Sequence, residues 1–271
     1  MRAGLVVGDE IVNVSSCLVP KTTNPEEVTN ALINTIKEVI TSNVEGIGVG
    51  VPSLVKTSSG VVYDVQNIPS WKKIPLKDIL EKAFGLPVYI NNDANCFAVG
   101  ERVYGAGKAY DDFVGLITGT GLGGGIIKRG HLLPDQNCGA GEFGMMPYLE
   151  HDFEYYCSGQ FFENMHGVNG GELAQQAALG DPKALAVFSE YGQHLGKAIK
   201  SILFAVDPNA IVLGGSVAKS YAYYKEAMWK EIKSFPYQFV LENFVIVPSV
   251  VKEIAILGAA ALYIDAATED L

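Results

Sequence analysis

The chain has 271 residues, 48% of them apolar, which is enough for a sizeable core in one large domain or two medium ones. A formal net charge of −10 and the lack of a run of lysine and arginine argue against a nucleic-acid-binding surface. The four cysteines lie far apart without a CxxC pair, which predicts reduced thiols rather than disulfides or a zinc site. No stretch approaches the roughly 18 apolar residues of a membrane span, and we expect a cytoplasmic protein without a membrane partner.

Strands and helices alternate in the first part of the chain, which predicts an α/β unit. It opens with two strands joined by the hairpin turn Gly8–Glu10, and Asn24 is expected to cap the first helix. The expected elements are strands 3–7, 11–19, 47–51 and 87–90, helices 25–40 and 75–84, and a further helix that ends near residue 104.

The second part repeats this pattern after a hinge at 105–108, which predicts a duplicated architecture with a cleft between two lobes. We assign residues 1–109 and 256–271 to a small lobe and residues 110–255 to a larger one. The expected elements are strands 112–117, 124–129, 210–213 and 244–247, helices 159–166, 171–179, 182–206, 221–233 and 256–267, and a glycine-rich excursion over 130–151.

Asp93 lies in a polar segment, residues 91–95, that follows an apolar strand and precedes a helix. Ligands of α/β proteins bind outside the carboxyl ends of strands, so this segment is a candidate site. The residue has two interpretations, a helix N-cap or a general base that accepts a proton from a substrate hydroxyl. Taken alone, the position favours the cap.

Residues 117–125 hold five glycines and two threonines between two strands. A dinucleotide fingerprint or a P-loop needs a following helix and is therefore excluded. Glycines allow backbone N–H groups to approach a ligand closely, and Thr118 and Thr120 add hydroxyl groups. The hairpin therefore predicts a phosphate site, and a glycine-rich hairpin without a ligand is the alternative.

Three further acids and amides stand in settings that suit a polar ligand. Glu142 lies between glycines, Glu154 precedes a helix among aromatic residues, and Asn67 lies in a turn. Taken alone, each glutamate is equally compatible with a solvated surface acid, and the position of Asn67 favours a turn residue. Together with Asn92 and Asp93 they suit the vicinal hydroxyls of a polyol. A hydroxyl-binding set and a phosphate hairpin in one chain predict phosphoryl transfer to a sugar.

These motifs resemble those of the ROK-family sugar kinases in the actin/hexokinase superfamily. The resemblance covers nearly the whole chain and places the family's motifs in the family's order. The matching segments are residues 67–71 (Asn-Ile-Pro-Ser-Trp), 92–95 (Asn-Asp-Ala-Asn), 118–125 (the glycine-rich hairpin), 207–215 (Asp-Pro-Asn-Ala-Ile-Val-Leu-Gly-Gly) and 257–260 (Leu-Gly-Ala-Ala).

The resemblance implies a two-lobed actin-like ATPase (ribonuclease H-like) α/β fold with an interlobe cleft. It implies ATP with Mg²⁺ as cofactors, a small-molecule sugar as substrate, and a homodimer. Asp93 is then the general base. The other implied roles are sugar binding by Asn67, Asn92, Glu142 and Glu154, phosphate binding by Thr118, Gly119, Thr120 and Gly121, and contact with adenosine by Gly214 and Gly215.

The chain departs from the family pattern in three places. The family's opening D-x-G-G-T-K strand and loop are missing before Met1, so the given sequence predicts a truncated first sheet. A misplaced start is the favoured explanation, and only if the sequence is complete as given do we expect poor ATP binding and turnover. The histidine of the family's Glu-x-Gly-His motif is replaced by Met145, which puts a preference for glucose in doubt. The family's cysteine-rich zinc loop is absent, and we expect neither structural zinc nor another bound metal site.

Two other functions compete with the kinase. A ROK protein that binds a sugar without catalysis, truncated or regulatory, fits the chain if its first strand is genuinely absent. A sugar-responsive transcription regulator would carry a helix-turn-helix domain, for which the sequence has no residues, and the acidic charge opposes DNA binding. Glucose, fructose, mannose, allose and N-acetylated hexosamines are all compatible substrates.

Overall fold

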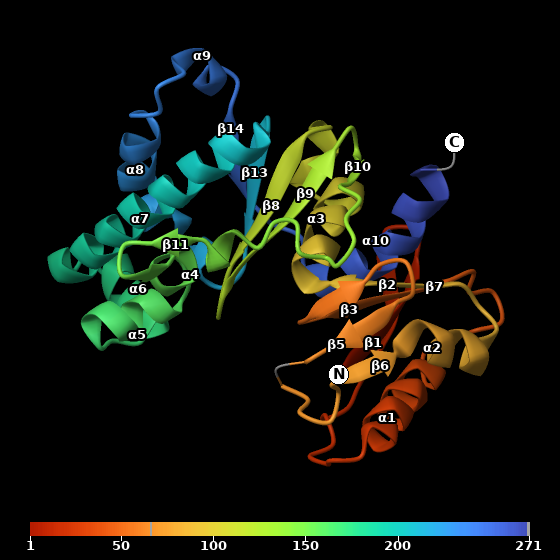
Figure 1. Cartoon of the computed structure of the whole chain (residues 1–271). Coiled ribbons are helices and arrows are strands. Elements are labelled where there is room, and N and C mark those ends of the chain that lie inside the picture. Colours follow the sequence, from red (N-terminus) through yellow and green to blue (C-terminus); the bar gives the residue numbers. More distant parts are fainter. Residues whose placement is uncertain (66, 270–271) are drawn as a thin grey trace. The chain divides into compact units, whose positions relative to one another are not determined.

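The computed structural model describes residues 1–65 and 67–269 (Figure 1). These residues form two compact units. The first contains Met1–Lys108, His131–Ala140 and the chain from Val251 onward, and the second contains Ala109–Gly130 and Gly141–Val250. The division into lobes 1–109 plus 256–271 and 110–255 stays a prediction, and the units differ from it chiefly in that 131–140 packs with the first.

The first unit pairs its strands in small sheets and packs helices against them. Its strands are β1 (Arg2–Val7), β2 (Glu10–Ser16), β3 (Ile47–Val51), β4 (Leu54–Lys56), β5 (Val61–Tyr63), β6 (Lys73–Pro75), β7 (Val88–Asn92) and β10 (His131–Leu132). Its helices are α1 (Pro25–Lys37), α2 (Leu76–Phe84), α3 (Asp93–Tyr104) and α10 (Ile254–Glu269).

The pairing of β3 with β7 sets the edge on which Asp93 stands. The two strands are parallel, and their register places Val51 opposite Asn92. The strand therefore runs to Asn92 instead of ending at residue 90 as predicted, so both Asn91 and Asn92 belong to the sheet. Antiparallel pairs β1–β2 and β4–β5–β6 form two further sheets. The second of these was not predicted, because each of its strands has only three residues.

Helix α10 packs closely on β3 and on α3, and glycines permit the approach. A Cβ atom on Gly48 would lie 1.7 Å from the carbonyl oxygen of Ala259, and one on Gly100 would lie 2.8 Å from the Cα of Gly258. On the other side, α1 contributes Val28 and Leu32 to a buried cluster that includes Trp71. Apolar layers thus hold the strands between helices.

The second unit is built on a sheet in which β9, β8, β13 and β14 are neighbours in that order. β9 runs antiparallel to β8, whereas β8, β13 and β14 are mutually parallel. Its strands are β8 (Phe113–Thr118), β9 (Leu122–Lys128), β11 (Pro147–Tyr148), β12 (His151–Asp152), β13 (Ala210–Gly214) and β14 (Val245–Pro248). Its helices are α4 (Phe153–Cys157), α5 (Gln160–His166), α6 (Gly170–Ala178), α7 (Pro182–Val206), α8 (Tyr221–Ile232) and α9 (Gln238–Leu241).

Short 3₁₀ turns complete the chain. They are η1 (Ala106–Ala109), η2 (Phe143–Met145) and η3 (Val217–Ser220). The predicted hinge at 105–108 is thus largely a 3₁₀ turn, and the predicted excursion over 130–151 contains η2 and short strands. Helices α4 and α9, with five and four residues, were not predicted.

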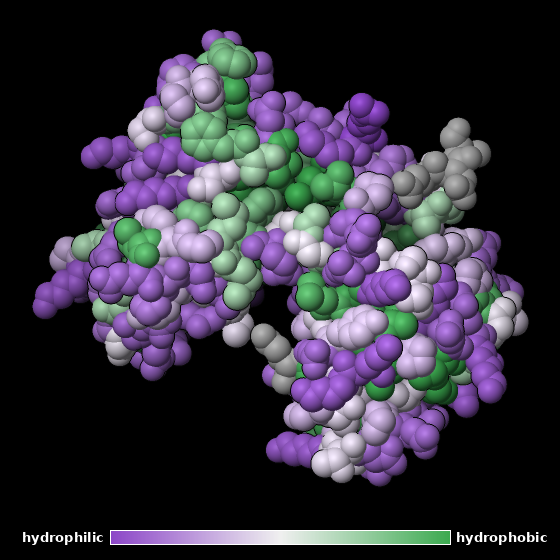
Figure 2. All heavy atoms as spheres, viewed as in Figure 1, coloured by the Kyte–Doolittle hydropathy of each residue, from purple (hydrophilic) through white to green (hydrophobic). Residues whose placement is uncertain are grey.

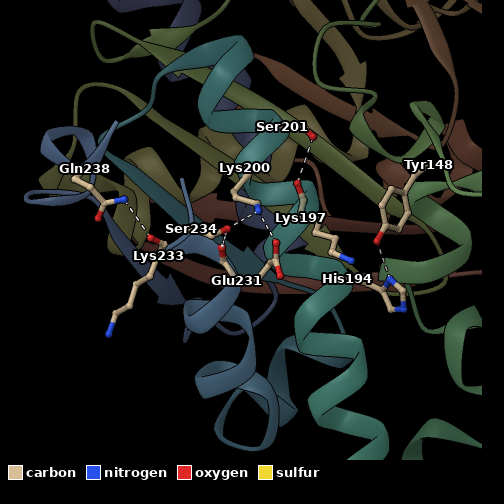
Figure 3. Close-up of polar contacts among 9 residues, drawn as sticks. All are labelled: Tyr148, His194, Lys197, Lys200, Ser201, Glu231, Lys233, Ser234 and Gln238. Carbon is tan, nitrogen blue, oxygen red and sulfur yellow. Dashed lines mark hydrogen bonds and ion pairs between the residues drawn. The ribbon is translucent and has the colours of Figure 1, made fainter. Parts of the chain in front are cut away.

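Helix α7 has the bounds that the sequence predicts, because Asp181 caps it, Pro182 follows and Asp207 ends it. It packs on α8, where a Cβ on Gly192 would lie 2.5 Å from the carbonyl oxygen of Tyr224. Lys200 of α7 pairs with Glu231 of α8, as Figure 3 shows. Tight backbone contact and an ion pair therefore fix the two helices together.

Hydrophilic residues cover much of the face in Figure 2, and hydrophobic ones gather around α9. Phe239 is 70% exposed and Tyr237 is 54% exposed there. No helix in the described part of the chain has the length and apolar character that crossing a bilayer requires.

We expect Gly48→Ala to destabilise the protein, because its methyl group would collide with the α10 backbone. Overpacking of this kind costs about 1–3 kcal/mol. Denaturant unfolding measures the loss. Gly139→Ala is the control, since a Cβ there meets nothing within 4 Å. Equal stability of the two variants would contradict the packing described for Gly48.

Candidate active site

Asn92, not Asp93, is the N-cap of α3. Its Oδ1 accepts a hydrogen bond from the backbone N–H of Asn95 at 2.7 Å, and its Nδ2 donates to the carbonyl oxygen of Cys138 at 2.8 Å. Asn92 is 4% exposed, so both bonds are sheltered from water. Asp93 is the first residue of the helix. The capping interpretation of Asp93 is therefore wrong, and its carboxylate is not needed for the cap.

The Asp93 carboxylate is exposed but lies close enough to protein atoms to lose part of its hydration. This desolvation raises its pKa, and hydrogen bonds from the backbone N–H groups of Ala94 and Asp93 itself oppose the rise. An accessible carboxylate with a raised pKa has the properties of a general base.

Two asparagines that were not predicted as site residues stabilise the turn between β7 and α3. Asn95 is 3% exposed, and its Nδ2 donates to Oδ1 of Asn91 at 2.8 Å. The same Asn91 oxygen accepts the backbone N–H of Asn92 at 2.9 Å. Their spacing of four residues across the start of a helix is the signal that would have indicated this bond.

Asn67 lies in the first unit and is exposed. It lines, together with Asp93, a cavity of about 1010 Å³ within that unit. The structure therefore places Asn67 and Asp93 at a common cavity, whereas Asn92 faces the protein interior through its two hydrogen bonds.

The glycine-rich hairpin of the second unit joins β8 to β9 through Gly119, Thr120 and Gly121. The backbone N–H of Gly119 donates to the carbonyl oxygen of Gly121 at 3.0 Å. Thr120 is exposed at the tip. The turn is shorter than predicted because β9 begins at Leu122 rather than at residue 124.

Thr118 ties this hairpin to the end of β13. Its buried Oγ1 donates to the carbonyl oxygen of Gly214 at 3.1 Å. Gly215 has a φ of 91°, and a Cβ on it would lie 2.3 Å from the carbonyl oxygen of Thr118. Only glycine fits such a position. The predicted phosphate and adenosine segments are therefore neighbours in the second unit, and the Thr118 hydroxyl connects them.

Glu154 also contacts the hairpin. Its Oε2 accepts the backbone N–H of Leu122 at 2.9 Å, and its Oε1 lies 3.3 Å from Nε2 of Gln160. Gln160 in turn donates to the carbonyl oxygen of Thr120 at 3.0 Å. Gly121 leaves room for the carboxylate, because a Cβ there would lie 2.5 Å from Glu154 Oε2. Glu154 thus stabilises the hairpin by accepting a hydrogen bond from its backbone at Leu122.

Glu142 reaches the same strand from another direction. The preceding Gly141 is buried with a φ of 97°, and a Cβ on it would lie 2.1 Å from the carbonyl oxygen of Gly124 in β9. Phe143 is buried beside it, whereas Glu142 is exposed. Glu142 and Glu154 are therefore carried by two different segments that both contact β9.

An aromatic cluster holds the segment that carries Glu154. Tyr148 stacks on Phe153 with ring centroids 4.5 Å apart, and its hydroxyl lies 3.0 Å from Nδ1 of His194 in α7 (Figure 3). Burial lowers the pKa of His194, Lys197 lowers it further, and Glu190 opposes both. The histidine is therefore neutral at pH 7, which suits a hydrogen bond with a phenol.

The structure shows no disulfide among the four cysteines. All four are free thiols, and burial raises the pKa of Cys138 to about 11 and that of Cys96 further still. Over residues 1–65 and 67–269, no group of three or more His, Cys, Asp and Glu side chains is placed to hold a metal ion.

Known proteins resemble this chain in sequence and in fold. A glucokinase of Thermotoga maritima is 26% identical over 273 residues, which cover 88% of this chain and 85% of that protein. A xylose repressor of Bacillus subtilis is 28% identical over 267 residues, covering 89% of this chain and 68% of the repressor. A ROK family glucokinase from Streptomyces griseus, solved with glucose and AMPPNP, aligns with a TM-score of 0.76 and 25% identity over 96% of this chain and 94% of that one.

The α/β architecture and this structural similarity define a protein of the actin-like ATPase fold, as the sequence predicts. The model of the ROK family matches residues 3–266. The chain therefore belongs to the ROK family, and the resemblance inferred from its motifs is confirmed.

We expect Asn92→Ala to destabilise the protein, because it removes the α3 cap and leaves the Cys138 carbonyl without its donor. A lost cap costs about 1 kcal/mol and an unsatisfied buried group about 1–3 kcal/mol more. Thermal unfolding should show a midpoint lower by at least about 4 °C. Asn30→Ala, an exposed substitution inside α1, is the control. Equal midpoints for both variants would count against the cap.

The lowered pKa of His194 predicts that the protein loses stability in acid. Because its folded pKa is below the unfolded value, the unfolded chain takes up the proton first as pH falls. The contribution is fully present above the unfolded pKa of about 6.5 and is lost as pH falls through the lower, folded pKa. Urea unfolding at pH 7.5 and pH 5 should show a larger loss for the parent chain than for His194→Gln. Identical losses would refute this assignment.

Proposed function

We propose that the chain is an ATP-dependent kinase that phosphorylates a hydroxyl of a hexose or related sugar. Relatives named glucokinase and N-acetyl-D-glucosamine kinase support this function. The structural observation that carries it is the Asp93 carboxylate. Asn92 performs the capping that Asp93 was a candidate for, and Asp93 keeps an accessible carboxylate of raised pKa at the cavity that Asn67 also lines.

Asp93 is the proposed general base. Its carboxylate would accept the proton of the sugar hydroxyl as the oxygen attacks the γ-phosphorus of ATP, and the bond from that phosphorus to the bridging oxygen of ADP breaks. A raised pKa makes a carboxylate a stronger base, provided that it is ionised at the working pH. The cap by Asn92 fixes the start of α3 and with it the position of the base.

The proposed sugar contacts are those of the resemblance, Asn67, Asn92, Glu142 and Glu154. Asn67 and Glu142 are exposed and have side chains accessible to a ligand. Asn92 and Glu154 already hold backbone groups of the chain, so their further role is to position Asp93 and the hairpin. Met145 has no strong hydrogen-bonding group where the family has histidine, and a substrate panel should therefore extend beyond glucose.

The proposed ATP contacts lie in the second unit. The hairpin of residues 118–121, whose Gly119 N–H already bonds to the Gly121 carbonyl oxygen, would face the phosphates, and Gly214 and Gly215 would face the adenosine. ATP use is supported by the AMPPNP bound to the Streptomyces griseus relative. Mg²⁺ would enter with ATP and neutralise phosphate charge.

A second candidate is a ROK protein that binds a sugar without phosphorylating it. The similarity to the Bacillus subtilis xylose repressor, which covers 89% of this chain, favours it. A kinase releases ADP in the presence of its sugar, whereas a binding protein gives a calorimetric signal with the sugar alone. As part of the kinase proposal we also expect a cytoplasmic location and a homodimer. Sedimentation measures the oligomeric state.

ADP release from MgATP over a panel of hexoses and N-acetylated hexosamines tests the proposal. We expect turnover with at least one sugar and a loss of about 10²–10⁴ in kcat for Asp93→Asn, because the base is removed. The variant should unfold at an equal or higher temperature, since a desolvated carboxylate of raised pKa destabilises the folded state when ionised.

Asp78→Asn is the matched control, because Asp78 is an exposed acid in the first turn of α2. It should keep full activity. Full activity in Asp93→Asn would exclude Asp93 as the base. No turnover of any sugar by a folded parent chain, combined with sugar binding in calorimetry, would establish the second candidate instead.

A further inference from the structure

Tyr191 of α7 has a buried hydroxyl that takes no part in the proposed contacts with sugar or ATP. The residue is 0% exposed, and its Oη donates a hydrogen bond to the carbonyl oxygen of Cys157, the last residue of α4, at 2.8 Å. Its ring packs on those of Phe161, Phe162 and Tyr224, with centroids 5.6, 5.5 and 5.1 Å away. The phenol is therefore fixed at its ring and at its oxygen.

The carbonyl that Tyr191 holds lies in the junction of α4 and α5, residues 154–160. This junction bonds the backbone of the glycine-rich hairpin at three positions. The bonds run from the Gly159 N–H to the Gly119 carbonyl oxygen at 2.7 Å, from Gln160 Nε2 to the Thr120 carbonyl oxygen at 3.0 Å, and from the Leu122 N–H to Glu154 Oε2 at 2.9 Å. The junction thus determines where the hairpin backbone lies.

Two of these bonds also fix the direction of the hairpin's peptide planes. In a planar trans peptide, the carbonyl of one residue and the N–H of the next point in opposite directions. The carbonyl oxygens of Gly119 and Thr120 face the junction. The N–H groups of Thr120 and Gly121 therefore point away from it. Two successive N–H groups directed to one side suit the oxygens of a phosphate.

The phenol of Tyr191 also reaches Thr118, where the hairpin begins. Thr118 is 0% exposed, and its hydroxyl donates to Gly214. Burial raises the pKa of Tyr191 well above its usual value, Tyr224 and Cys157 raise it further, and a hydrogen bond with Thr118 opposes the rise. The phenol therefore stays protonated and remains a donor to the Cys157 carbonyl oxygen.

We propose that Tyr191 is a positioning residue for the hairpin: its hydroxyl holds the junction of α4 and α5, which in turn directs the Thr120 and Gly121 N–H groups toward a bound phosphate. Tyr191 touches neither ligand and acts through the backbone of the junction. This role rests on the proposed function, in which the hairpin binds the phosphates of ATP.

Calorimetric titration of the full chain with AMPPNP and Mg²⁺ tests this role without any turnover. Tyr191→Phe keeps the packed ring and removes only the hydroxyl. We expect the Kd for AMPPNP to rise at least about tenfold, because binding must then order the hairpin. The Kd for adenosine, which lacks phosphates, should stay unchanged, since Thr118 still bonds Gly214. A purely structural role of the hydroxyl would lower the unfolding temperature without separating the two ligands.

Tyr224→Phe is the matched control. Tyr224 is 0% exposed and packs on Tyr191, but within the described residues its hydroxyl has no hydrogen-bond partner. Its removal deletes the same group from the same aromatic cluster without breaking a bond. The Kd for AMPPNP should therefore equal that of the parent chain.

Gln160→Ala tests the same connection at its surface end. Gln160 is exposed, so the substitution leaves the core intact. It removes the donor to the Thr120 carbonyl oxygen and frees the peptide plane that carries the Gly121 N–H. We expect weaker binding of AMPPNP and unchanged binding of adenosine, as for Tyr191→Phe.

A selective loss of AMPPNP affinity in both Tyr191→Phe and Gln160→Ala supports the proposal. Parent-like AMPPNP affinity in either variant overturns it, and so does an equal loss of affinity for adenosine. If Tyr191→Phe does not fold, Gln160→Ala decides by the same criteria. A parent chain that binds no AMPPNP would refute ATP use, which is the failure of the proposed function itself and of this role with it.

Discussion

The two hydrogen bonds of the Asn92 side chain set the geometry on which the candidate catalytic edge depends. In one bond Asn92 accepts the backbone N–H of Asn95 in the first turn of α3. In the other it donates to the carbonyl oxygen of Cys138 and holds that segment against the end of β7. Because one buried amide satisfies both, the cap does not require the neighbouring carboxylate of Asp93. Asn91 and Asn95 reinforce the same turn with a hydrogen bond between their side chains. A rigid backbone that carries an accessible carboxylate is what a positioned base requires.

In the second unit, rigidity comes from close backbone approach instead of buried amides. Gly215 lies against the Thr118 carbonyl, and the Thr118 hydroxyl returns a bond to Gly214. Glu154 then holds the start of β9 at Leu122. The hairpin therefore keeps its shape before any ligand arrives. A hairpin that is ordered in advance would meet the main demand of the proposed phosphoryl transfer, which is positioning without a further cost of ordering.

The sequence predicts elements well where a strong local signal exists. Proline at residue 182 and a long apolar stripe predict the start and course of α7, and Asp207 with the following proline predicts its end. The sequence does not distinguish Asn92 from Asp93 as the cap of α3, because both residue types are good caps. The choice depends on the register that pairs Asn92 with Val51. The contact of Glu154 with the Leu122 amide joins residues 32 apart, so no local pattern indicates it. The three-residue strands β4–β6 are too short to show alternation.

The register of β3 and β7 connects the first sheet to the proposed base. Val51 ends β3 opposite Asn92, so the pairing of the two strands sets the backbone from which the Asn92 side chain caps α3. Stability in proteins is distributed in cooperative units. The strand pair and the start of α3 share Asn92, so the proposed position of Asp93 as a base depends on this pairing as well as on the cap.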